Sequence, residues 1–184
     1  MPNALLLALF SFSIFLGTVF EFAIPGTTIM QTGQTIAVLC AGALLGPRLG
    51  AASVGLYILL GVIGVPVFSE GASGLQVLLG ASGGYLLGFI VAAAAMGGWR
   101  NAGLMRGPFS TVVGMLFGHA IILVCGWLGM TVLMGSHAAY ENGVAPFYLG
   151  SGVKSVLATV LLLVVQRMLP RGQKVFSWQR ELGQ

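Results

Sequence analysis

The sequence contains no aspartate, and charged residues make up only 7% of its 184 residues. Soluble domains carry about 25% charged residues, so this chain has too little charge to cover a water-exposed surface. Hydrophobic residues account for 57% of the chain, and this composition predicts an integral membrane protein. The net charge of +4 does not indicate nucleic acid as a partner, because the sequence offers no exposed domain on which basic residues cluster.

Further absences narrow the classes of function. No G-x-x-x-x-G-K-[ST] motif occurs, so the chain is not expected to bind ATP through a P-loop. Without aspartate, the chain has few carboxylates for the intramembrane relay that is typical of a proton- or sodium-driven pump. His119 and His137 lie far apart without a cluster of further ligands, so no metal site is expected. Cys40 and Cys125 both lie in apolar runs and are interpreted as buried small side chains rather than a disulfide.

The apolar runs predict a bundle of six transmembrane helices in a single transmembrane domain over residues 1–184, since a span needs about 20 residues. A segment between the third and fourth runs, residues 68–84, is too rich in glycine and polar residues to span. The expected spans are 4–22, 29–45, 49–65, 85–96, 109–134 and 149–169.

The charged residues predict the orientation of this bundle. With six spans, the basic residues of the loops and the C-terminal tail all fall on one side, and the positive-inside rule makes that side cytoplasmic. Both termini are therefore expected inside. The basic residues are Arg48, Arg100, Arg106, Arg167, Arg171, Lys174 and Arg180, and the opposite side carries Glu21, Glu70, His137 and Glu141.

Lys154 is a cation inside the outer part of the sixth expected span. A lysine at the centre of a span costs about 2.5–3.5 kcal/mol, and less near an end. Either the side chain snorkels to the membrane surface, or it faces a cavity and pairs with a ligand carboxylate. Ser151 lies three residues earlier and is expected on the same helix face.

Other polar and small residues give signals with two interpretations each. The outer end of the second span carries Gln31, Thr32, Gln34 and Thr35, which either bond to neighbouring helices or face a polar ligand. Gly84 permits close approach of backbone to a ligand or helix, and Tyr85 either borders a pocket or belongs to the interfacial aromatic belt. Ala4 and Ala8 form a small-x-x-x-small pair, which suits internal packing or docking to a separate membrane subunit.

Two short G-A-S-G stretches, at 71–74 and 80–83, resemble the nucleophile motif of rhomboid intramembrane serine proteases, with His119 downstream. That family places its base in the sixth core span and an H-x-x-x-N motif in the second, and neither feature is present here. This protease is kept as a distant alternative, and no enzyme is expected.

Three longer blocks resemble the BioY family, the biotin-binding S components of energy-coupling factor (ECF) transporters. They read A-G-A-L-L-G-P-R-L-G at 41–50, L-G-V-I-G-V-P-V-F at 60–68 and G-G-Y-L-L-G-F at 83–89. A fourth segment, 146–154, resembles the P-F-x-x-G-D-x-x-K pattern of the family. The resemblance implies a six-helix subunit that captures biotin from outside. A transmembrane coupling subunit and two ATPase subunits, which bind ATP, would drive the uptake.

The resemblance also implies roles for particular residues. Lys154 is the matching lysine, Gln31 and Thr32 match a polar pair near the pocket, and Tyr85 matches an aromatic residue of the pocket. Ala4 and Ala8 are the matching candidates for docking of the coupling subunit.

The chain departs from the family pattern at three positions. Ser151 replaces the acidic residue, Ala81 replaces a proline, and Glu70 replaces a glycine. Glu70 or Glu21 could supply the missing acceptor. The ligand is therefore expected to be biotin or a related carboxylated vitamin such as lipoate. A solitary secondary biotin transporter is a further alternative.

Overall fold

The computed structural model describes residues 3–22 and 31–168, and this part of the chain is almost entirely helical. Its six long helices are α1 (Asn3–Val19), α2 (Gln34–Leu45), α3 (Pro47–Val62), α5 (Gly83–Asn101), α6 (Pro108–Met134) and α8 (Tyr148–Met168). The shorter elements are β1 (Glu21–Phe22), β2 (Gln31–Thr32), η1 (Ser69–Gly71), α4 (Leu75–Leu79), α7 (Ser136–Gly143) and η2 (Ala145–Phe147). The predicted six-helix bundle is thus present.

Four of the expected spans need corrected boundaries. The second span was expected over 29–45, but α2 begins only at Gln34, because residues 31–32 leave the helix and pair as β2 with β1. The fourth was expected over 85–96, but α5 extends over Gly83–Asn101. The first and third were expected to end at 22 and 65, but α1 ends at Val19 and α3 at Val62. At 1.5 Å per residue α2 is only about 18 Å long, so it does not cross a bilayer core of about 30 Å alone.

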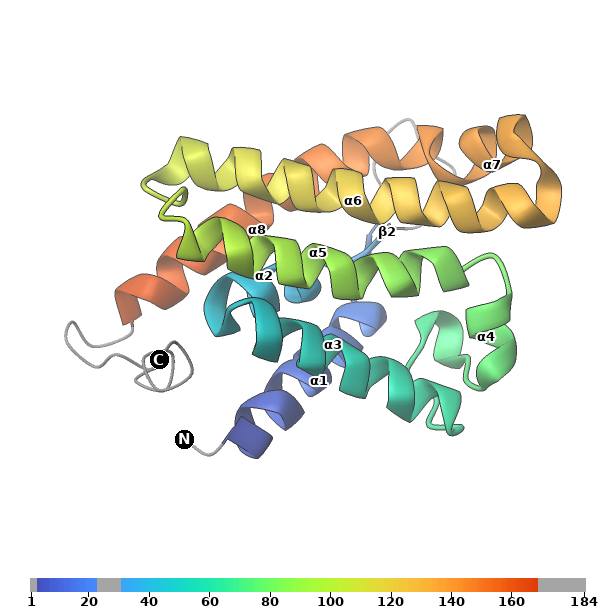
Figure 1. Cartoon of the computed structure of the whole chain (residues 1–184), viewed down its shortest axis with the longest axis horizontal. Helices are drawn as coiled ribbons and strands as arrows, with labels where there is room; N and C mark the ends of the chain where they lie inside the picture. Colours follow the sequence, from blue (N-terminus) through green and yellow to red (C-terminus); the bar gives the residue numbers. More distant parts are fainter. Residues whose placement is uncertain (1–2, 23–30, 169–184) are drawn as a thin grey trace.

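Helix α5 lies at the centre of the bundle, between α6 on one side and α3 on the other (Figure 1). It also packs against α2, while α1 covers α2 and α3, and α8 packs against α6 and α2. The side chains of the core come from all six long helices, and Tyr57, Ile14, Leu39, Met96 and Met115 are fully buried. Small residues permit this close packing: a Cβ on Gly84 would meet the backbone carbonyl of Cys125 on α6.

The sharp turn between α2 and α3 explains the A-G-A-L-L-G-P-R block. Gly46 has φ 82° and ψ 176°, a conformation that is essentially restricted to glycine. Pro47 follows at the first position of α3, where its missing N–H costs nothing. Arg100 of α5 donates from Nη1 to the carbonyl of Leu44, 2.7 Å away, and so caps the C-terminus of α2. This block therefore builds the end of the bundle opposite the cavity described below.

By length and hydropathy, α6 and the stretch 136–168 that contains α8 can cross a membrane, and α1, α2 and α3 are shorter apolar helices. The start of α1, the α2–α3 turn, the α5–α6 connection and the end of α8 lie toward one end of the bundle (Figure 1). Helices α4 and α7 lie toward the other. The chain therefore passes back and forth along the bundle axis as predicted.

Candidate ligand-binding cavity

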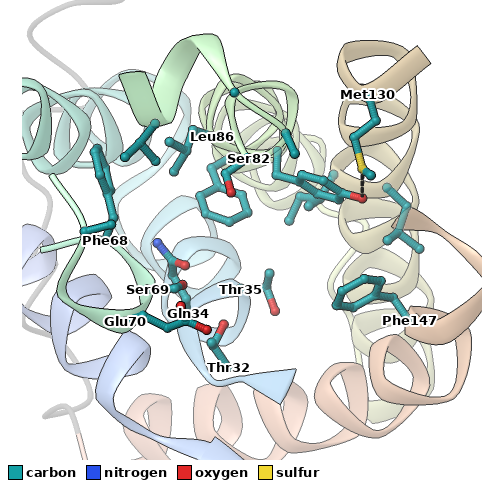
Figure 2. A pocket seen from close by; sticks show the side chains of 18 of the residues that line it. Thr32, Gln34, Thr35, Phe68, Ser69, Glu70, Ser82, Leu86, Met130 and Phe147 are labelled. Carbon is teal, nitrogen blue, oxygen red and sulfur yellow. Dashed lines mark hydrogen bonds between the residues drawn. The ribbon is translucent and has the colours of Figure 1, made fainter. Parts of the chain in front are cut away.

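A cavity of about 730 Å³ lies within the end of the bundle that carries α4 and α7. Pockets of about 300–1,000 Å³ are typical of small-molecule sites. Phe68 and Leu86 border it on one side and Phe147 on the other, with polar side chains between them (Figure 2). Its polar lining consists of Thr32, Gln34, Thr35, Tyr57, Ser69, Glu70, Ser82, Tyr85, His119, Asn142, Ser151 and Lys154.

Lys154 reaches this cavity from α8 and is only 4% exposed. Within residues 3–22 and 31–168 its ammonium group has no hydrogen bond or ion pair. Burial of this kind excludes snorkelling to the membrane surface, the alternative left open by the sequence. An unpaired ammonium inside a bundle is costly, so a cavity lined by Lys154 favours an anionic ligand group.

His119, on α6, joins three helices beneath the cavity and is 2% exposed. Its Nε2 lies 3.1 Å from Thr35 Oγ1 on α2, and its Nδ1 lies 2.9 Å from Ser155 Oγ on α8. The same Nδ1 lies 3.0 Å from the carbonyl of Met115. Ser155 Oγ donates in turn to the carbonyl of Ser151, 2.7 Å away. Thr35 and the part of α8 that carries Lys154 are thereby held in one network.

A second network fixes the other end of the cavity floor. Gln34 donates from Nε2 to Tyr57 Oη at 2.6 Å, and Tyr57 donates to the carbonyl of Val67 at 3.0 Å. The ring of Tyr57 packs edge-on against Phe68, with centroids 5.7 Å apart. The start of α2 is therefore tied to α3 and to the loop that follows it.

Tyr85, on α5, braces the opposite border. Its hydroxyl donates to the carbonyl of Gly143 at the end of α7, and Met130 Sδ lies 3.4 Å from the same oxygen (Figure 2). Its ring contacts Phe147 of η2, with centroids 6.3 Å apart. Tyr85 thus lines the cavity and anchors α7. Of the two interpretations from the sequence, the structure therefore favours the pocket position over the interfacial aromatic belt.

The structure brings together five of the predicted site residues and separates two. Those that line the cavity are Lys154, Ser151, Thr32, Tyr85 and Glu70. Gln31 does not line it: the side chain is fully buried, and within residues 3–22 and 31–168 neither amide atom has a hydrogen-bond partner. Gly84 does not line it either, since it faces α6.

Glu70 occupies a strained position at the cavity border. Its φ of 59° and ψ of 22° place it in the left-handed region, and no other non-glycine residue of the described chain has a positive φ. Such a conformation costs a residue with a side chain about 1–3 kcal/mol. This explains why glycine suits the position, while Glu21, the other candidate acceptor, has a side chain outside the described part.

Gln34 and Thr35 belong to the polar stretch that was predicted at the outer end of the second span, and both line the cavity. Tyr57 and His119 also line it and were not predicted as site residues. The available signal for these two was a polar side chain within a long apolar run. Because they lie on α3 and α6, their pairing with the start of α2 depends on the packing. Within the described residues, His119 bonds to Ser155 and Thr35 and not to Ser73 or Ser82 of the two G-A-S-G stretches.

On α1, Ala4 and Ala8 are exposed, together with the larger apolar side chains of Leu5, Leu9 and Phe12. The two alanines therefore do not pack inside this chain, which was one interpretation of the small-x-x-x-small pair. Their face is available to lipid or to another membrane protein.

Comparison with known proteins gives consistent matches. The model of the BioY family matches residues 1–171. Biotin transporter BioY2 of Lactococcus lactis is 35% identical over 160 residues, which covers 84% of this chain and 86% of that protein. Biotin transporter BioY of Rhodobacter capsulatus is 30% identical over 182 residues, covering 91% and 95%. A crystal structure of the S-component for biotin from an ECF-type ABC transporter has the same fold, with a TM-score of 0.76, 22% identity and coverage of 90% and 91%.

Proposed function

Because the chain belongs to the BioY family, we propose that it is the substrate-binding membrane subunit of a vitamin transporter and that it binds biotin. The observation that carries the proposal is Lys154, which is buried in a cavity of small-molecule size and has no counter-ion among the described residues. The valerate carboxylate of biotin supplies the missing counter-ion, and the aromatic and aliphatic lining covers the fused rings.

The exposed face of α1 supports a coupled mechanism. We propose that Ala4 and Ala8 allow a transmembrane coupling subunit to approach α1 closely, and that two ATPase subunits bind the ATP. The subunit would lie as a multi-pass protein in the bacterial plasma membrane, with both termini in the cytoplasm and the cavity open to the outside. Uptake without these partners would instead indicate a solitary secondary transporter.

Ser151 supports a second candidate ligand. A serine in place of the family's acidic residue accepts a hydrogen bond from a ring N–H more weakly than a carboxylate does. A carboxylated vitamin without such an N–H, lipoate for example, would still pair with Lys154.

Titration of the purified protein in detergent tests the proposal. Biotin should bind saturably in the micromolar range or tighter, and excess lipoate should not displace it. If lipoate binds and biotin does not, the second candidate replaces the first. If neither binds, this chain is not a receptor for a carboxylated vitamin.

A further inference from the structure

We propose that Gln34 and Thr35, two consecutive residues at the start of α2, act as a pair of hydrogen-bond acceptors for ring N–H groups of the ligand. The proposal rests on the proposed function, since it assigns the ureido N–H groups of biotin to these two side chains. It follows from two hydrogen-bond chains, each of which ends on a backbone carbonyl. A carbonyl can only accept, so it fixes the direction of every bond before it.

The first chain orients Gln34. The carbonyl of Val67 accepts from Tyr57 Oη, which has a single hydrogen and uses it there. Tyr57 can therefore only accept from Gln34, whose Nε2 lies 2.6 Å away. The amide is thus oriented with its nitrogen toward Tyr57. Its oxygen, Oε1, has no hydrogen-bond partner in residues 3–22 and 31–168.

The second chain orients Thr35. The carbonyl of Ser151 accepts from Ser155 Oγ, so Ser155 accepts from His119, and His119 Nδ1 carries the proton. The same N–H faces the carbonyl of Met115, in agreement with this assignment. The ring is 2% exposed and contacts no carboxylate among the described residues, so the neutral ring is favoured and Nε2 keeps its lone pair.

Thr35 therefore donates its one hydroxyl hydrogen to His119 Nε2, at 3.1 Å. Thr35 Oγ1 can therefore only accept a further hydrogen bond. Both side chains line the cavity, and both are at least nine-tenths buried, at 5% and 9% exposure for Gln34 and Thr35. Figure 2 shows them between Phe68 and Phe147, which also line the cavity.

The cavity thus combines two acceptors on α2 with one cation on α8. The complementary ligand carries N–H donors on its ring system and a carboxylate on a side arm. Biotin has both features, whereas the dithiolane ring of lipoate has no N–H to offer. The pair on α2 also supplies acceptors that do not depend on an acidic residue at the position of Ser151.

The test compares Thr35→Val, which keeps the shape but loses the acceptor, with Thr35→Ser, which keeps the hydroxyl. The valine variant should bind biotin about tenfold or more weakly, because one buried ligand donor is left unpaired. The serine variant should bind within about threefold of the wild type, since it still accepts the hydrogen bond. Gln34→Met tests the second acceptor in the same way and serves if the valine variant does not fold.

Two modified ligands separate this role from a loss of structure. Biotin methylated on both ureido nitrogens has no ring donor, so Thr35→Val should not weaken its binding further. The valerate amide of biotin keeps the ring donors, so Thr35→Val should weaken it by the same factor as biotin. An equal loss for the methylated compound would overturn the proposal.

Nitrogen NMR of ¹⁵N-histidine-labelled protein tests the orientation without any ligand. The buried signal, which is absent in a His119→Asn variant, should report a neutral ring with the proton on Nδ1, and exposed His137 supplies the reference. A proton on Nε2 would make Thr35 a donor toward the cavity and would overturn the proposal. If wild-type protein fails to bind biotin, the proposed function fails. If it binds and Thr35→Val keeps full affinity, the acceptor pair alone fails.

Discussion

Replacing Lys154 by methionine should change ligand affinity and stability in opposite directions. Methionine keeps a long apolar side chain and removes the charge. Removing one partner of a buried, hydrogen-bonded charge pair costs about 2–5 kcal/mol of binding free energy, which is about 30- to 5,000-fold in affinity for biotin. The uncharged valerate amide of biotin cannot form the ion pair, so its affinity should fall by less than about threefold.

Without ligand, the same substitution should stabilise the protein. Lys154 is 4% exposed and unpaired within the described residues, so the folded state carries the cost of a buried charge. We expect relief of about 1–3 kcal/mol in the free energy of unfolding. For a chain of this size that corresponds to a rise of roughly 2–10 °C in the midpoint of thermal unfolding.

Thermal unfolding in detergent, with and without each ligand, measures both effects on the same samples. Arg167→Met is the matched control, because Arg167 is an exposed cation at the end of the same helix. It should alter neither affinity nor midpoint. A ligand-free Lys154→Met protein that is less stable than the wild type, or equal losses for the acid and the amide, would refute the role of Lys154 as an unpaired cation that awaits a carboxylate.

Three further predictions concern other elements. Glu70→Gly should raise the free energy of unfolding by about 0.5–1 kcal/mol, because glycine adopts φ 59° without strain. Thermal or chemical unfolding measures this change, and a loss of stability would mean that the carboxylate holds the loop. Gly84→Ala should lower the free energy of unfolding by about 1–3 kcal/mol, since the added Cβ meets the α6 backbone. Gly98→Ala on the same helix is the control: its Cβ enters open space, so it should be neutral or stabilising in the same assay. Ala8→Trp should leave biotin affinity unchanged but abolish uptake in cells that supply coupling and ATPase subunits; normal uptake would exclude this face of α1 as the docking surface.

The membrane class and most of the helices could be predicted from the sequence, because they depend on local composition. Long apolar runs predicted α6 and α8 to within one residue at each end, since each such run must satisfy its backbone within a helix. The prediction failed for the start of α2, where the polar residues Gln31 and Thr32 leave the helix and pair as β2 with β1. That pairing joins Glu21 to Thr32 and Phe22 to Gln31, and apolar periodicity carries no information about which segments pair.

The candidate site divides in the same way. Lys154 stood out in the sequence because a charge in an apolar helix is costly wherever the helix packs. Only the tertiary structure decided that the ammonium is buried in a cavity rather than extended to the surface. It also decided which hydroxyls and amides accept and which donate, since Thr35 meets His119, 84 residues away, and Gln34 meets Tyr57, 23 residues away. A hydroxyl has one hydrogen, and its partner in the fold determines where that hydrogen points.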